Sequence, residues 1–126
     1  MAFSRDLLIG QWYQTQTNEQ GNLLTEYALM SIDGSYEFTF VEHDASGQIK
    51  SQIIEFGDWG LVGDIHFTIA KGEVVNQEQY SADLADPNNY HAYKVIKLTN
   101  KEFIYQHVET NEQYTLTRVS DNVAYC

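Results

Sequence analysis

The feature that most constrains this chain is a series of short runs in which apolar and polar side chains alternate between turn-forming residues. Such alternation gives each strand of a sheet one apolar face. Helical periodicity is weak, apart from one short helical turn that Ser4 can cap at residues 5–8. We expect eight strands, at residues 11–17, 23–32, 35–42, 48–57, 64–71, 91–99, 102–109 and 112–119.

Four tight turns predict how neighbouring strands pair. The stretches IDGS, TNKE and ETNE each place a two-residue turn between alternating runs, and a further turn is expected at Val62-Gly63. The turn at Val62-Gly63 groups Ile54, Phe56, Phe67 and Ile69 on one side of the sheet. The pairs expected from the other three are Leu29–Phe38, Tyr27–Phe40, Leu98–Phe103, Ile96–Tyr105, Lys94–His107, His107–Tyr114, Tyr105–Leu116 and Phe103–Arg118.

Sequential antiparallel strands with short connections form a meander, and eight of them can close into an up-and-down β-barrel. Residues 1–126 are expected to form a single all-β domain of this kind. Aromatic residues make up 13% of the chain, which suits the pleated surface of strands. A barrel of eight strands encloses just enough room for side chains or for one small ligand.

One end of this barrel is marked by Gly10, Trp12 and Arg118. Closure brings the first strand beside the last, which places the Arg118 guanidinium near the Trp12 indole, a favourable cation–π pair. Gly10-Gln11-Trp12 resembles the GxW motif on the first strand of lipocalin-like (calycin) domains, and Arg118 resembles the basic residue that packs across that Trp. The resemblance implies a barrel that is closed at the Trp12 end and takes a small ligand through its other end.

The open end is expected to gather the loops at 17–22, 43–47, 71–90 and 109–112, and the long 71–90 connection can lie over it as a helical turn or two. Aromatic and polar side chains on the expected inner face are typical of a ligand pocket, and the alternative is a filled core. The polar residues Gln14, Gln16, Lys94 and His107 favour a partly open upper half. A Lys–His–Tyr cluster can bind an anionic head group, or it can be a hydrogen-bonded interior network. The candidate ligand-binding residues are Tyr27, Phe38, Phe40, Ile54, Phe56, Phe67, Lys94, Ile96, Tyr105, His107 and Tyr114.

The charge balance disfavours several classes of partner. The formal net charge of −11 repels nucleic-acid phosphates and anionic membrane surfaces. No metal-ligand spacing, nucleophile motif or dinucleotide fingerprint occurs, so we expect no metal, no cofactor and no catalytic residues. The lone Cys126 is expected to be an incidental thiol, and nothing in the sequence favours an oxidising compartment over the cytoplasm.

Three functional hypotheses follow, and the sequence leaves the oligomeric state open. The first is non-catalytic binding of a small apolar or amphipathic ligand inside the barrel. The second is a barrel with a filled core that acts as a protein-interaction or inhibitor module, with Tyr13, Ile53 and Trp59 expected on the outer surface and His66 beside Trp59. The third is a calycin-type enzyme that uses His107, Tyr114 or Lys94.

Overall fold

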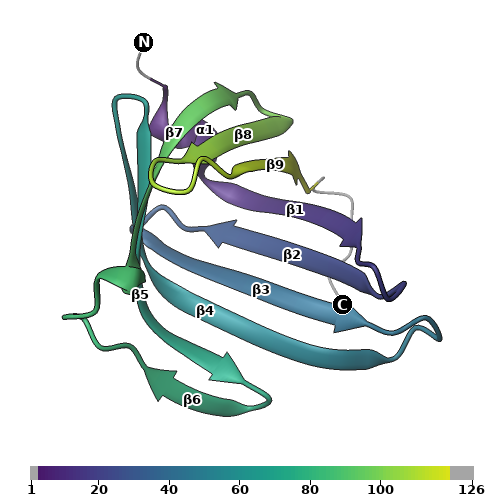
Figure 1. Ribbon diagram of the computed structural model, residues 1–126. Coiled ribbons are helices and arrows are strands. Elements are labelled where there is room, and N and C mark those ends of the chain that lie inside the picture. Colours follow the sequence, from purple (N-terminus) through teal and green to yellow (C-terminus); the bar gives the residue numbers. More distant parts are fainter. Residues whose placement is uncertain (1–2, 120–126) are drawn as a thin grey trace.

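The computed structural model describes residues 3–119, and Cys126 lies outside the described residues (Figure 1). The helical turn expected after Ser4 is present. In chain order the elements are α1 (Arg5–Leu8), β1 (Gly10–Thr17), β2 (Leu23–Met30), β3 (Ser35–His43), β4 (Ile49–Val62), β5 (Ile65–Val75), β6 (Glu78–Ser81), a 3-10 turn (Pro87–Asn89), β7 (Tyr90–Leu98), β8 (Glu102–His107) and β9 (Gln113–Arg118).

Eight of these strands form a closed antiparallel barrel, which confirms the predicted fold class. Each strand pairs with the next along the chain, β6 excepted, and β9 returns to pair with β1. Within residues 3–119 the closing seam is short: β1 and β9 share the pairs Trp12–Arg118 and Tyr13–Thr117, and the Val119 N–H donates to the Gln11 carbonyl beside them. Beyond Tyr13, β1 continues to Thr17 paired with β2 alone, and Figure 1 shows β1 to β4 side by side as one extended sheet. The barrel is therefore tightly closed at one end and splayed at the other.

The turn between β2 and β3 contains three residues, and this changes the predicted pairing. Ser31 and Ser35 close the loop with a backbone hydrogen bond, and Gly34 adopts a φ of 90°. A three-residue loop ending in a left-handed glycine is a common alternative to the two-residue hairpin. Phe38 consequently pairs with Ala28 rather than Leu29. The one-residue shift turns Leu29, and Tyr27 with it, to the outer face.

A β-bulge interrupts the pairing of β7 with β8. Leu98 pairs with Phe103 as predicted, but the register shifts between Val95 and Lys97. Because the bulge takes up Ile96, Tyr93 rather than Lys94 pairs with His107. A bulge adds one unpaired residue and reverses the faces beyond it.

The other two turns displace pairs without exchanging faces. The loop after β8 is longer than predicted, so Tyr105 pairs with Tyr114, and Phe103 with Leu116. The β4–β5 turn is centred on Gly63 and Asp64, and Gly60 pairs with Phe67. The shift is by an even number of residues, so Phe67 shares a face with Ile69 as predicted.

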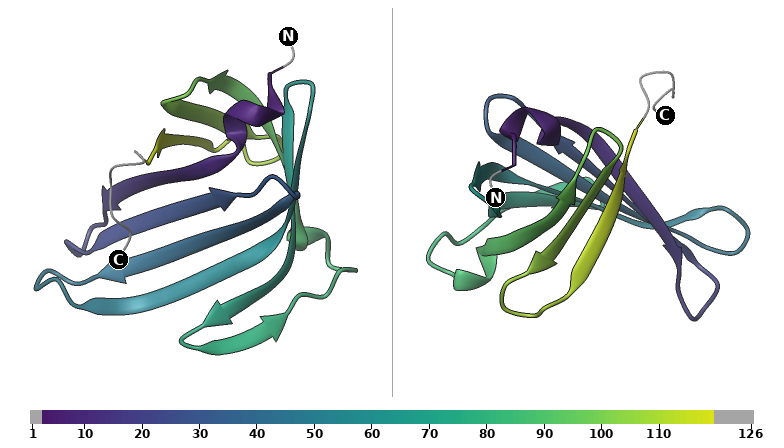
Figure 2. Two further views of the ribbon diagram at one scale, coloured as in Figure 1. Left: turned by 180° about the vertical axis from the view of Figure 1, so that it is seen from behind. Right: turned by 90° about the horizontal axis from the view of Figure 1, so that it is seen from above.

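The long connection at 71–90 extends the sheet instead of forming helical turns over the mouth. Residues 71–75 complete β5, and β6 pairs with that extension. Figure 2 shows β6 at the outer edge of this hairpin, whose other strand, the extension of β5, pairs with β4. No helix among residues 3–119 is long and apolar enough to cross a membrane.

Candidate functional site

The closed end of the barrel is built around Trp12 and Arg118. Trp12 is completely buried, and its indole N–H donates to the Leu8 carbonyl at 3.0 Å. The Arg118 guanidinium lies 4.2 Å from the centre of the Trp12 ring and donates to the carbonyls of Leu7, Ile9 and Asn100. This one side chain thereby ties β9 to the N-terminal segment and to the β7–β8 turn.

Gly10 makes this arrangement possible. Its φ is 131°, and a Cβ at this position would lie 2.4 Å from Arg118 Nη1. The spacing of Gly10 and Trp12 in the sequence therefore has a direct physical reason, which is that the guanidinium occupies the space beside the glycine.

A second pair of Trp and Arg closes the same end, and the sequence analysis missed it. Arg5 in α1 lies over Trp59 at 4.6 Å, and the Trp59 indole donates to the Ser31 carbonyl at 3.0 Å. Trp59 is 4% exposed and His66 only 2%, so the prediction that both face outward is wrong. Ile53, also predicted to face outward, pairs with Phe40 on the inner face.

The half of the barrel next to this end is filled by side chains. Trp12, Phe103, Leu8 and Leu116 are its largest fully buried apolar residues, and the His66 ring packs edge to face against Phe103. Burial lowers the pKa of His66 to about 4, although a contact with the Gly60 carbonyl opposes the shift.

The open half is different, because polar and aromatic side chains face a cavity of about 330 Å³ there. Gln14 Nε2 donates to Glu26 Oε1 at 3.0 Å across β1 and β2. Burial is the main cause that raises the pKa of Glu26, and Glu55 adds to it. The inward residues around the cavity are Gln14, Gln16, Leu24, Glu26, Phe40, Glu42, Ser51, Ile53 and Tyr114.

Five of the eleven predicted ligand-binding residues lie on the inner face. Tyr105 stacks on Tyr114 at 5.2 Å between ring centres, and Phe38 meets Phe40 edge to face at 6.4 Å. His107 is 6% exposed and faces inward beside Tyr93. Phe40 and Tyr114 line the cavity itself.

The other six lie on the outer face or at the bulge, so their predicted inward placement is corrected. The three-residue loop turns Tyr27 outward, where it is 44% exposed. The bulge turns Lys94 outward and leaves Ile96 45% exposed. The other three residues sit together on the outer side of the β4–β5 ladder, as the alternation of these strands requires; they are Ile54, Phe56 and Phe67.

The predicted cluster of Lys94, His107 and Tyr114 does not form, and a pair of histidines replaces it. His107 Nδ1 accepts hydrogen bonds from the backbone N–H groups of Glu109 and Thr110. Its proton therefore lies on Nε2, which is 3.1 Å from His91 Nδ1 and donates to it. The neighbour of His107 in this arrangement is His91, and Lys94 is turned to the outer face.

Three inward carboxylates are the main feature that the sequence analysis missed. Glu26 and Glu42 line the cavity, and Glu55 accepts a hydrogen bond from the Tyr36 hydroxyl at 2.8 Å. Glu42 alternates with Phe40, which was predicted to face inward, and Glu55 faces inward because it pairs with Phe38. The position of Glu26 becomes readable only when the β2–β3 register is known.

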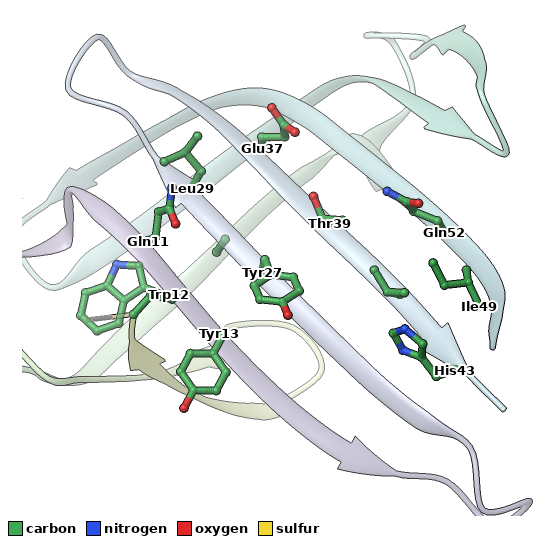
Figure 3. A pocket seen from close by; sticks show the side chains of 13 residues that line it. Gln11, Trp12, Tyr13, Tyr27, Leu29, Glu37, Thr39, His43, Ile49 and Gln52 are labelled. Carbon is green, nitrogen blue, oxygen red and sulfur yellow. The ribbon is translucent and has the colours of Figure 1, made fainter. Parts of the chain in front are cut away.

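A broader groove of about 770 Å³ crosses the outer face of β1–β4. Figure 3 shows Tyr13, Tyr27 and Leu29 among the side chains that line it. Tyr13 is thus on the outer surface as predicted, at 37% exposure. The groove is apolar in its middle and carries Glu37, His43 and Gln52 on the β3 and β4 side.

Comparison with known proteins adds no assignment to this geometry. No protein-family model matches the sequence, and no curated protein shows detectable sequence similarity to it. Within residues 3–119, no three His, Cys, Asp or Glu side chains are grouped so that they could hold a metal ion.

Proposed function

We propose that this chain binds a small, partly apolar molecule in the open half of its barrel and performs no chemistry on it. The observation that carries the proposal is the contrast between the two halves, one filled by side chains and the other holding a cavity. The cavity has aromatic walls and a few oriented polar groups, the composition usual for small-molecule sites. Its volume of about 330 Å³ lies in the lower range of such sites.

The likeness of Gly10, Trp12 and Arg118 to the lipocalin motif supports the same proposal. Each of these residues serves to close one end. A barrel with one sealed end and one open end presents a single entrance, as ligand-binding calycin domains do.

A second candidate function is docking of a protein through the outer face of β1–β4. The groove there favours it, because Tyr13, Tyr27 and Leu29 are all more than one third exposed. Large apolar patches on a surface often mark interaction sites.

Two neighbouring residues allow one experiment to separate the two sites. Ser51 lines the inner cavity, and Gln52 lines the outer groove. N-phenyl-1-naphthylamine, a neutral dye that fluoresces in apolar surroundings, is titrated into the wild type, Ser51→Phe and Gln52→Phe. We expect saturable binding that Ser51→Phe weakens at least about tenfold, or ~1.4 kcal/mol, and that Gln52→Phe leaves unchanged.

The reverse pattern would move the binding site to the outer groove. If none of the three proteins binds the dye, or a second neutral apolar dye, the interior-binding proposal is rejected.

A further inference from the structure

The inner face carries an excess of negative charge that no cation balances. All seven Lys and Arg residues lie in the described range, and none of them contacts Glu26 or Glu55. Arg118 faces inward but is engaged at the closed end, and Arg5 lies over Trp59. Lys71 and Lys97 are paired with carboxylates of the outer surface, and Lys94 and Lys101 are exposed.

The negative charge at the rim of the cavity is partly neutralised, whereas the negative charge further inside is not. Glu42 Oε2 accepts from Asn22 Nδ2 at 2.7 Å and lies 3.9 Å from the Lys50 ammonium. Glu26, further inside, is held only by the neutral amide of Gln14. Glu55 is held by the neutral phenol of Tyr36. Both inner carboxylates are thus oriented by hydrogen bonds, but neither has a partner of opposite charge.

Aromatic rings surround the same space. Phe40 and Tyr114 line the cavity with Glu26, and Tyr114 stacks on Tyr105. A cation gains from the faces of aromatic rings as well as from a carboxylate. A metal ion, by contrast, needs oxygen ligands on most sides, and the rings leave too few positions for them.

A layer of buried hydroxyl groups lies deeper inside the barrel. Thr68 is 1% exposed, and its hydroxyl lies beside the hydroxyls of Tyr36 and Tyr93 on the inner face. Tyr36 in turn donates to Glu55. The groups that surround the Glu55 carboxylate on this side are therefore polar but uncharged.

We propose that the ligand of this barrel is an organic cation, a protonated amine carried on an aromatic or apolar body. Its ammonium group lies at Glu26, directed inward toward Glu55, and its body lies against Phe40 and Tyr114. The inference rests on the proposed interior binding and reverses the sequence-based expectation of an anionic head group, which depended on an inward Lys94. The net charge of −11 also favours the approach of cations.

The test uses three ligands that share one skeleton and differ only in charge: 4-phenylbutylamine, 4-phenylbutanol and 4-phenylbutanoate. Isothermal titration at pH 7 of the wild type, Glu26→Gln and Glu37→Gln gives their affinities. Glu37 lies on the outer groove, so its variant makes the same change in net charge outside the cavity. We expect the amine to bind the wild type at least tenfold more tightly than the alcohol, and the carboxylate to bind most weakly.

Glu26→Gln should lose most of the preference for the amine while keeping its affinity for the alcohol within about threefold, a difference of ~0.6 kcal/mol. Glu37→Gln should behave like the wild type. Equal binding of amine and alcohol to the wild type overturns the cationic ligand and leaves interior binding intact. Absence of binding by all three ligands overturns both proposals. Should Glu26→Gln fail to fold, the ligand series on the wild type still decides the question.

Discussion

At the scale of single residues, the closed end depends on a glycine that no other residue can replace. Gly10 combines a positive φ with the close approach of Arg118. Any side chain at this position must adopt a strained backbone conformation and must also displace the guanidinium from Trp12 and from the Ile9 carbonyl.

We therefore predict that Gly10→Ala destabilises the fold by roughly 1–3 kcal/mol, the range for such strain together with a lost contact. Gly21→Ala is the matched control. Gly21 also has a positive φ, of 81°, but no atom would lie within 4 Å of its Cβ. Urea unfolding of both variants gives the comparison, and equal losses would show that contact with Arg118 is unimportant.

His66 should make stability depend on pH. Burial lowers the pKa of His66 to about 4 in the folded protein, whereas the free imidazole of the unfolded chain has a pKa of 6.5. The unfolded chain therefore binds the proton more readily. The stability that the neutral ring provides is complete above pH 6.5 and is lost as the pH falls toward 4.

The expected loss from this residue between pH 7 and pH 5 is about 2 kcal/mol. Urea unfolding of the wild type and of His66→Gln at the two pH values isolates the contribution of His66. The raised pKa of Glu26 changes stability with pH in the opposite direction, but this effect is common to both proteins and cancels in the comparison. An NMR titration of the wild type provides a second readout. A His66 ring that protonates near pH 6.5 would contradict the prediction.

At the scale of elements, the bulge in β7 decides which of its side chains reach the interior. Val95 is 3% exposed and pairs with Tyr105, whereas Lys94 lies on the other face and Ile96 bulges out. Without the bulge, alternation would have placed Lys94 and Ile96 inside, as the sequence predicts.

Three substitutions along this strand test the bulge. Lys94→Gln and Ile96→Gln should each change stability by no more than about 0.5 kcal/mol, as exposed sites do. Val95→Gln should cost roughly 1–3 kcal/mol, because it buries an amide without a partner. Thermal unfolding of the three variants measures these changes in stability. A large loss of stability for Ile96→Gln would show that Ile96 is buried, as the predicted register requires.

At the scale of the whole molecule, the barrel is closed and well packed at one end and open at the other. In the described part of the chain the closing seam has pairs at Trp12 and Tyr13, and residues 14–17 of β1 pair with β2 alone. Buried aromatic residues support the seam from inside, while the ends of β1 and β4 border the cavities.

Amide hydrogen exchange should follow this division. Protected amides near Trp12, Trp59 and Phe103 are expected to exchange slowest, and those of residues 14–17 and 49–52 faster, because local opening is easiest where few buried contacts are lost. Exchange measured residue by residue by NMR provides the map. Uniform protection along β1 and β4 would contradict a barrel of unequal halves.

The sequence by itself determined the barrel and its closed end. Strict alternation and regularly spaced turns leave few other arrangements, and the partnership of Trp12 with Arg118 follows from closing the first strand on the last. These features are local or follow from chain order, so no knowledge of packing was needed.

Only the tertiary structure decided what faces the cavity. Because side chains alternate with a period of two, one additional residue in the Gly34 loop and one in the bulge at Ile96 exchanged the faces of Tyr27 and Lys94. The first of these shifts brought Glu26 inside, and the pairing of β4 with β3 placed Glu55 beside Phe38 on the inner face. An expected cationic interior became an acidic one. Loop length and bulges depend on how the strands fit around a common core, and this fit is settled by contacts between residues far apart in the chain.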